Sequence, residues 1–353
     1  MDHQKAQKNL APLLKPVGSL YSSLMSLRAR LYLGGLKKSR KPKAFSVAVG
    51  NISWGGSGKT PLADWLLGWG KNRGLTTALL TRGYGGKSEE RPLLVKPHST
   101  PAQSGDEPLM LARSHPESYI LADPRRSRAL AWLEASTTAN FIVLDDAMQH
   151  LAIGRDLNLV LLRAKDLTDE FWGKVIPAGE WREGPSALAR ASAFLLRMPP
   201  EAFAEAGELI KKRLAPYNKP IFSFDLCPAG LTALGKPEQP LKSLGGRAYA
   251  LCTGVGSPEQ VARSAEILLG APPARLLAYP DHHKFTAADL KQMSKLRLPV
   301  VMTAKDAVKI EPLLLGGLEM EGYVLESRVI FGPVMLAGRD FESWLEERRH
   351  ELA

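Results

Sequence analysis

A glycine-rich segment that follows an apolar run is the feature that most restricts how this chain can fold. The run Ala44–Gly50 is rich in β-favouring residues, residues 53–60 spell Ser-Trp-Gly-Gly-Ser-Gly-Lys-Thr, and the helix-compatible stretch Pro61–Arg73 follows. Glycines let backbone N–H groups surround a phosphate, and a helix amino terminus adds partial positive charge. A strand, a Gly-Lys-Thr turn and a helix in this order predict a phosphate-binding loop (P-loop) in a nucleotide-binding protein.

The residues of this loop have distinct predicted roles. We expect the Lys59 ammonium to reach the β- and γ-phosphates of ATP and the Thr60 hydroxyl to hold Mg²⁺. Ser53 replaces the usual first glycine, which is a departure from the standard spacing. The predicted ATP-binding residues are Ser53, Trp54, Gly55, Gly56, Ser57, Gly58, Lys59 and Thr60.

Two acids end a later apolar run. Phe141–Leu144 is apolar, and Asp145 and Asp146 follow it directly. Two carboxylates at one strand end repel each other unless a cation lies there. We therefore expect these acids to hold or orient Mg²⁺, although an apolar run that ends in Asp is also common at ordinary strand ends.

Apolar, β-rich runs recur along the chain and alternate with helix-compatible stretches. They lie at Ala44–Gly50, Thr76–Thr81, Tyr119–Ala122, Phe141–Asp145, Leu157–Leu162, Ala193–Met198 and Pro220–Phe224, and again at Tyr249–Thr253, Arg275–Tyr279 and Val300–Thr303. This alternation predicts an α/β protein with a P-loop NTPase-like parallel sheet, helices on both of its faces, and a second, smaller α/β lobe.

The Gly- and Pro-rich stretch Cys227–Gly246 has no clear period and marks the predicted domain boundary. We expect four segments. They are a basic amphipathic arm over 1–43, a P-loop core over 44–226, a linker or β-ribbon over 227–246, and a smaller lobe over 247–353 that closes the active site.

The net charge of +11 is concentrated in the amino-terminal arm. Residues 1–43 contain ten Lys or Arg and one acid, a net charge of +9, so the other 310 residues carry only +2. A nucleic-acid-binding body more often carries its own basic face, so we expect no nucleic-acid partner.

The same arm has an apolar stripe at helical spacing, formed by Leu13, Val17, Leu20, Leu24, Leu27 and Leu31. An apolar stripe beside a basic run predicts a helix that lies on an anionic membrane surface. The alternative is a helix that packs on the protein's own core, and both could hold at once.

Composition excludes several classes of protein. Hydrophobic residues make up 44% and charged residues 24%, a balance typical of a folded chain. The longest apolar runs are shorter than the roughly 18 residues that span a bilayer. The two cysteines, Cys227 and Cys252, are too few for a disulfide framework.

Four further polar clusters follow predicted strands or open helices, where ligands bind in α/β sheets. They are Thr81-Arg82-Gly83-Tyr84-Gly85-Gly86, Gly105-Asp106-Glu107-Pro108, Asp281-His282-His283 and Thr303-Ala304-Lys305-Asp306. Each cluster alone is more often a capped turn, and Asp106 is a plausible helix N-cap. Four of them in one chain favour a binding site.

These motifs together resemble those of tetraacyldisaccharide 4′-kinase, the lipid A 4′-kinase of Gram-negative bacteria. The resemblance rests on Val49-Gly50-Asn51, Gly55-Gly56-Ser57-Gly58-Lys59-Thr60-Pro61, Arg82-Gly83-Tyr84-Gly85-Gly86, Gly105-Asp106-Glu107-Pro108, Asp145-Asp146-Ala147-Met148-Gln149-His150 and Thr303-Ala304-Lys305-Asp306. It extends from residue 10 to about residue 310. The chain departs from the usual pattern at Thr81 and at Ala147-Met148, and neither departure removes a charged group.

The resemblance implies a reaction. The γ-phosphate of ATP is transferred to the 4′-hydroxyl of a tetraacylated glucosamine disaccharide 1-phosphate, which forms lipid IVA in lipopolysaccharide synthesis. It also implies a peripheral protein at the cytoplasmic face of the inner membrane, with two lobes joined by a β-ribbon and the active site between them. We expect a monomer that uses Mg²⁺ with ATP and binds the acylated disaccharide at an anionic membrane surface.

The resemblance also suggests roles for single residues. Asp106 is the candidate base, and His282 would pair with it. Glu107 and Asp145 are the Mg²⁺ candidates, followed by Asp146 and Gln149. Phosphate and substrate contacts are expected from Asn51, Arg82, Tyr84, Arg125, Gln149 and Arg182, since guanidinium groups bind phosphate bidentately. Each arginine could instead form an ordinary surface ion pair.

Three alternatives use the same residues differently. The first is a P-loop nucleotide-dependent switch or chaperone without lipid kinase activity, although an Asn-Lys-x-Asp motif that would indicate GTP is absent. The second is a two-metal phosphoesterase built on Asp281-His282-His283, for which a chain with seven histidines offers few further ligands. The third is a basic nucleic-acid binder, which the position of the charge disfavours.

Overall fold

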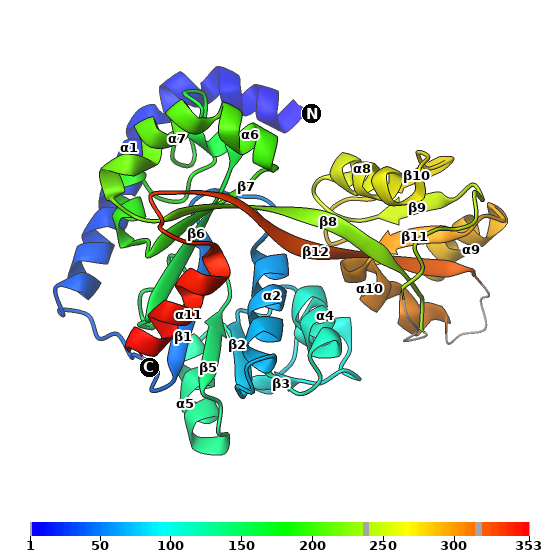
Figure 1. The fold of residues 1–353 in the computed structure, drawn as a ribbon, viewed down its shortest axis with the longest axis horizontal. Helices are drawn as coiled ribbons and strands as arrows, with labels where there is room; N and C mark the ends of the chain where they lie inside the picture. Colours follow the sequence, from blue (N-terminus) through cyan, green and yellow to red (C-terminus); the bar gives the residue numbers. More distant parts are fainter. Residues whose placement is uncertain (1, 236–239, 315–319, 353) are drawn as a thin grey trace. The chain divides into compact units, whose positions relative to one another are not determined.

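The computed structural model describes residues 2–235, 240–314 and 320–352 (Figure 1). The chain forms two compact units. Unit 1 comprises Met1–Arg82, Asp123–Asp225 and Ile330–Ala353, and unit 2 comprises Gly83–Ala122 and Leu226–Val329. This division differs from the expected boundaries, because residues 83–122 join the later unit and residues 330–353 return to the earlier one.

The sheet of unit 1 places β1 at its centre. Its strand order is β8-β7-β6-β1-β5-β2, and the paired strands run parallel. The strands are β1 (Phe45–Asn51), β2 (Thr77–Thr81), β5 (Phe141–Leu144), β6 (Leu157–Arg163), β7 (Ala193–Arg197) and the first part of β8 (Ile221–Ala233). Because β1 and β5 are parallel neighbours, the P-loop and the Asp145-Asp146 pair leave the same edge of the sheet.

Several helices complete unit 1. The helix α2 (Lys59–Lys71) packs on β1, β2 and β5, and α5 (Arg126–Ser136) packs on β2. The remaining helical segments are α6 (Pro200–Glu205), α7 (Gly207–Leu214), α11 (Phe341–Leu352) and the 3₁₀ turns η1 (Ala164–Leu167), η2 (Pro185–Arg190) and η3 (Ala215–Tyr217).

The amino-terminal helix α1 (Asp2–Leu33) has two different faces. Gly18 and Ala29 are buried, and Tyr21 packs against the core of unit 1. On the other side, Leu13, Val17, Leu20, Leu24 and Leu27 are 52–76% exposed. Leu31, expected in the same stripe, is half-buried. Among the described residues, no helix is both long and apolar enough to cross a membrane.

Unit 2 has its own parallel strands in the order β10-β9-β11-β12. They are β9 (Ala250–Thr253), β10 (Arg275–Ala278), β11 (Val300–Thr303) and β12 (Gly322–Met335), with helices α8 (Pro258–Leu269), α9 (Ala287–Lys295) and α10 (Ala304–Leu314). The segment 83–122 adds β3 (Leu93–Val95), α3 (Pro101–Ser104), α4 (Asp106–Ser114) and β4 (Tyr119–Ala122), and α4 packs against α10.

Two long strands contribute residues to both units. β8 continues through residues 226–233, into the stretch that we expected to be a linker or β-ribbon, and its sheet neighbour β12 was not predicted. Pro228 and Gly230 lie inside β8, and these residue types normally indicate a loop. The predicted fold class is confirmed: a P-loop-like α/β sheet with helices, a second α/β unit and an amino-terminal helix.

Candidate active site

The P-loop of unit 1 connects β1 to α2. Gly58 adopts a φ of 89°, which favours glycine, and Lys59 begins the helix. A Cβ at Gly55, where φ is 104°, would lie 2.8 Å from the Arg163 guanidinium. Glycines at these two positions therefore allow both the turn and the close packing beneath it.

Lys59 is held by two acceptors. Its Nζ donates to Asn51 Oδ1 at 3.1 Å and lies 3.6 Å from Asp146 Oδ1. Asn51 is fully buried, and its amide donates to the Ser53 carbonyl at 2.6 Å. Asn51, predicted to contact phosphate or substrate, therefore supports the loop and orients Lys59.

Two serines of the loop are buried. The Ser53 hydroxyl donates to Asp166 at 3.1 Å, and Arg163 also binds that carboxylate, at 2.8 Å. The serine that replaces the usual first glycine thus anchors the loop from within. The Ser57 hydroxyl has no hydrogen-bond partner among the described residues, which suits a group that a bound phosphate would satisfy.

The two acids after β5 have different surroundings. Asp145 is buried and accepts from the Thr81 hydroxyl at 3.0 Å. Asp146 has a φ of 44° and contacts Arg182 at 2.9 and 3.1 Å. Burial alone would raise the pKa of Asp146, but Lys59 and Arg182 lower it below its usual value. Asp146 therefore stays ionised beside Lys59.

Arg182 and Gln149 complete this cluster. Arg182 lies 5.5 Å from the centre of the exposed Trp54 ring and 3.4 Å from the Gln149 side-chain oxygen. Gln149 donates to the Asn51 carbonyl at 3.1 Å. Arg28 of α1 donates to the Gln149 carbonyl at 3.0 Å, so the amino-terminal helix also contacts the site.

Sequence reasoning missed one arginine of this cluster. Arg126 is buried and donates to the Asp145 carbonyl at 2.6 Å. The adjacent Arg125, which we predicted as a site residue, is exposed. It is the N-cap of α5, and its backbone N–H donates to Asp123 Oδ1. Arg82 is exposed. Burial, and to a smaller extent the charge of Arg82, lower the pKa of Arg126, while Asp145 and Asp146 oppose that shift. The sequence shows two adjacent arginines but not which one is buried. That depends on their positions at the start of α5, where Arg125 is exposed and Arg126 is buried.

The acidic cluster of unit 2 lies where α4 meets α10. Asp106 is the first residue of α4 and Gly105 is its N-cap, so the N-cap alternative for Asp106 is wrong. Asp106 is 7% exposed, and its Oδ2 lies 3.1 Å from His282 Nδ1 and 3.9 Å from Lys309 Nζ. Lys305 Nζ lies 3.3 Å from Glu107. The structure thus brings the predicted base and its histidine together.

The neighbouring histidine and tyrosine have separate positions. His283 Nε2 lies 3.2 Å from Asp289 and its ring stacks on Tyr279, so His283 and His282 have different acidic partners. The Tyr84 ring lies 5.4 Å from that of His282. No group of three or more His, Cys, Asp or Glu side chains suited to a metal occurs in the described part of the chain.

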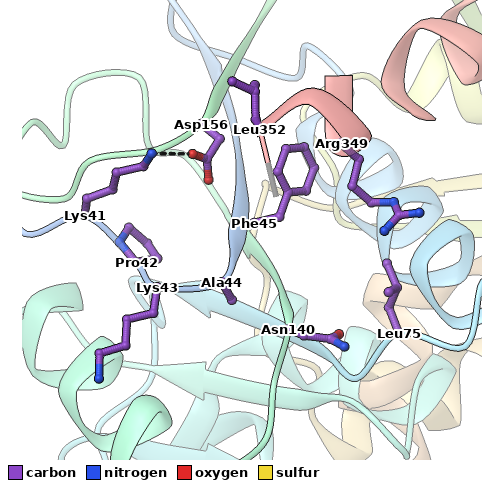
Figure 2. Close-up of a pocket in the computed structure, with 10 residues that line it drawn as sticks. All are labelled: Lys41, Pro42, Lys43, Ala44, Phe45, Leu75, Asn140, Asp156, Arg349 and Leu352. Carbon is purple, nitrogen blue, oxygen red and sulfur yellow. Dashed lines mark ion pairs between the residues drawn. The ribbon is translucent and has the colours of Figure 1, made fainter. Parts of the chain in front are cut away.

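A cavity of about 330 Å³ lies beside the starts of β1 and β5, at the ends of these strands away from the P-loop (Figure 2). Phe45 at the start of β1 and Asn140 before β5 line it, and Lys41 pairs there with Asp156 at 2.7 Å. The P-loop leaves the other end of β1, roughly 20 Å away at about 3.3 Å per strand residue. This cavity is therefore separate from the phosphate-binding loop.

Comparisons with known proteins point to one family. The family described as "Tetraacyldisaccharide-1-P 4'-kinase" matches residues 10–345. A tetraacyldisaccharide 4'-kinase of Nitratidesulfovibrio vulgaris is 44% identical, over 98% of this chain and 96% of its own. One of Oleidesulfovibrio alaskensis is 41% identical, over 98% of each. The crystal structure of Aquifex aeolicus LpxK in complex with ATP is similar, with a TM-score of 0.76, 26% identity, and coverage of 97% of this chain and 99% of the other.

Proposed function

Because this chain belongs to the tetraacyldisaccharide-1-P 4'-kinase family, we propose how its residues carry out that reaction. The protein is an ATP-dependent kinase that phosphorylates the 4′-hydroxyl of a tetraacylated disaccharide 1-phosphate in lipid A synthesis. The proposed nucleotide-binding residues lie in unit 1, and the proposed proton-accepting residue, Asp106, lies in unit 2.

The P-loop binds the ATP phosphates through its backbone N–H groups. Lys59 exchanges its contacts with Asn51 and Asp146 for the β- and γ-phosphates, where its charge stabilises the transferring group. Asn51 and Asp146 keep the lysine extended toward the loop before the nucleotide binds. Arg182, which forms an ion pair with Asp146, and Arg82 are the candidates to hold phosphate oxygens.

The donor set fits Mg²⁺ in part. Thr60 of the P-loop and Asp145 at the adjacent strand end supply oxygen atoms, the ligands that Mg²⁺ prefers, and nucleotide phosphates would supply others. Asp146 contributes negative charge nearby, and Glu107 is the candidate in unit 2. When bound, the ion would neutralise charge on the phosphates. The chain's own side chains carry out the other steps of the proposed reaction.

Asp106 accepts the proton of the substrate hydroxyl. As the 4′-oxygen bonds to the γ-phosphorus, the bond to the β–γ bridging oxygen breaks, ADP leaves, and the hydroxyl proton moves to the Asp106 carboxylate. His282 Nδ1 lies 3.1 Å from Oδ2, a contact that holds the direction of the carboxylate. Tyr84, beside the His282 ring, is a candidate sugar contact.

The exposed face of α1 supports action at a membrane surface. Its five leucine and valine side chains are more than half exposed, and the basic run after the helix adds attraction to anionic lipid. We infer a peripheral protein at the cytoplasmic face of the inner membrane, where the acylated substrate and ATP are both accessible.

The observation that carries the proposal is the contact between Asp106 and His282. A nucleotide-dependent switch activates water or changes partners and needs no base for a sugar hydroxyl, so this contact favours the kinase over the switch.

The direct test is transfer of labelled γ-phosphate to the disaccharide lipid in detergent. Lys59→Ala should lower kcat by roughly 100-fold or more, because water cannot replace its charge in the site. Lys71→Ala, at the exposed far end of α2, is the matched control and should retain activity. Near-normal phosphorylation by Lys59→Ala would remove the P-loop from the mechanism, and hydrolysis without lipid phosphorylation would favour the switch.

A further inference from the structure

Lys305 of unit 2 contacts three polar side chains, one of which is His282. It is the second residue of α10, and its side chain is 16% exposed. Nζ lies 3.2 Å from His282 Nε2, 3.1 Å from Asp281 Oδ1 and 3.3 Å from Glu107 Oε1. A lysine ammonium has three N–H donors and no acceptor, so His282 Nε2 and Asp281 Oδ1 both accept from it, and Glu107 is its ion-pair partner.

Lys305 faces His282 as a hydrogen-bond donor. A lysine ammonium carries three N–H donors and has no lone pair to offer. Its Nζ lies 3.2 Å from His282 Nε2. The His282 nitrogen that faces it must therefore act as the acceptor.

We propose that Lys305 is a positioning residue that fixes the tautomer of His282. The inference rests on the proposed role of Asp106 as the base. With Nε2 accepting from Lys305, the one ring proton of a neutral imidazole lies on Nδ1, 3.1 Å from Asp106 Oδ2, and is donated to the carboxylate. The opposite tautomer would set an Nδ1 lone pair against a carboxylate oxygen and an Nε2–H against an ammonium. Both contacts would be repulsive.

Lys305 also contacts the loop that carries the ring. Asp281 Oδ1 accepts from Lys305 and from the His282 backbone N–H at 3.0 Å, and that N–H also approaches the Gly254 carbonyl at 3.2 Å. His282 has a φ of 60°, a left-handed conformation that a non-glycine residue adopts only when its surroundings hold it. The same lysine thus helps to fix both the backbone and the ring of His282.

The other groups near this pair are Tyr84 and Lys309. The Tyr84 ring centre is 5.4 Å from that of His282. Lys309, one turn further along α10, lies 3.0 Å from Asp306 Oδ1 and 3.9 Å from Asp106 Oδ2. Lys309 is therefore a second cation near Asp106, but its shorter ion pair is with Asp306.

The test is the nitrogen spectrum of His282 in full-length protein labelled with ¹⁵N-histidine. Long-range proton–nitrogen correlations distinguish a protonated from an unprotonated ring nitrogen, and the signals lost in His282→Gln identify the residue. Lys305→Met removes the donor and the charge, and Lys309→Met is the matched control for charge. Thermal unfolding of each variant checks that it folds.

We expect the Nδ1–H form in the wild type and in Lys309→Met, and a substantial Nε2–H population in Lys305→Met. In the lipid assay, Lys305→Met should lower kcat roughly 10- to 100-fold with little change in the KM for ATP, and Lys305→Arg should restore part of the loss. An Nε2–H form in the wild type, or an unchanged tautomer in Lys305→Met, overturns the proposal. The wild-type spectrum alone decides it if Lys305→Met does not fold. Failure of the base assignment is a separate result, seen as retained activity in Asp106→Ala.

Discussion

At the residue scale, neighbouring side chains of the same type have different surroundings. Asp145 is buried against Thr81, whereas Asp146 binds Lys59 and Arg182. The sequence shows two adjacent carboxylates and predicts a cation near them. Which acid faces which cation follows from the turn at Asp146, where φ is positive.

The pairing of Asp106 with His282 predicts non-additive kinetics. Asp106→Ala and His282→Ala should each lower kcat, and the double variant should lose much less than the product of the two losses, because residues that act as one unit fail together. Steady-state phosphorylation of the lipid by all four proteins measures this. His283→Ala, which removes the neighbouring ring from its contact with Asp289, is the control and should lose far less. Fully multiplicative losses would show that Asp106 and His282 act separately.

His150 predicts a loss of stability in acid. Burial, and then the charges of Arg126 and Arg155, lower the pKa of His150 to about 4 from 6.5. Between these pH values the unfolded chain binds a proton that the folded protein does not, so the free energy of unfolding falls as the pH falls from about 6.5 to about 4. Allowing for solvent screening of a partly exposed ring, the loss from this residue is of order 1–2 kcal/mol.

Denaturant unfolding of the wild type and His150→Gln across this pH range measures that loss. The variant should show a shallower decline, since glutamine binds no proton. His98→Gln, on a surface loop, serves as the control. Parallel curves for the wild type and His150→Gln would contradict the prediction.

At the scale of elements, α1 combines two interactions in one helix. Gly18 allows close approach, since a Cβ there would lie 3.0 Å from the Val175 carbonyl, and the opposite face carries exposed apolar side chains. The periodicity predicted both the helix and its stripe. It could not decide whether the stripe faces the core, because an amphipathic pattern is the same in either environment.

The exposed stripe predicts membrane binding that resists salt. Changing Leu20, Leu24 and Leu27 together to Gln should release the protein from anionic vesicles at high salt. The variant then binds mainly through its basic run, whose attraction to lipid is screened by salt, whereas burial of apolar side chains in the wild type is not screened. The packed face of α1 is untouched, so folding should be retained. Flotation at low and high salt is the measurement, and Ser19→Ala with Ser23→Ala is the control on exposed polar positions of the same helix. Equal flotation of the triple variant and the wild type at high salt would place the membrane contact elsewhere.

At the scale of the whole molecule, the last segment of the chain completes the first unit. Phe341 of α11 is fully buried, with its ring 5.2 Å from Phe222 and 5.6 Å from Trp65. Arg73, two residues after α2, also binds Glu342, at 3.0 Å, and Glu346. The carboxyl-terminal residues, outside the motif resemblance, are thus part of the nucleotide-binding unit.

This arrangement predicts that core substitutions act on separate units. Phe341→Ala should lower the unfolding free energy of unit 1 by about 3–5 kcal/mol, because it leaves a cavity among aromatic rings. Leu290→Ala, a buried site of unit 2, should cost about 2–5 kcal/mol in that unit. Hydrogen exchange followed by mass spectrometry should show lost protection in β1 and β7 for the first variant and in β9 and β11 for the second. Loss in β9 and β11 for Phe341→Ala alone would contradict the assignment of α11.

The sequence by itself determined the P-loop, the strand ends that carry acids, most strands and helices, and through its motifs the family. These signals are local, because strand and helix periodicity and turn chemistry depend on residues close together in the chain. The pairing of Asp106 with His282, 176 positions apart, was expected only through the family resemblance, and the structure places the two side chains in contact. Only the tertiary structure selected Arg126 over Arg125 and buried Asn51 beneath Lys59. It also assigned 83–122 to unit 2 and 330–353 to unit 1. Such choices depend on the packing of distant segments, whose free energy is a property of the whole fold and leaves no periodic trace in the sequence.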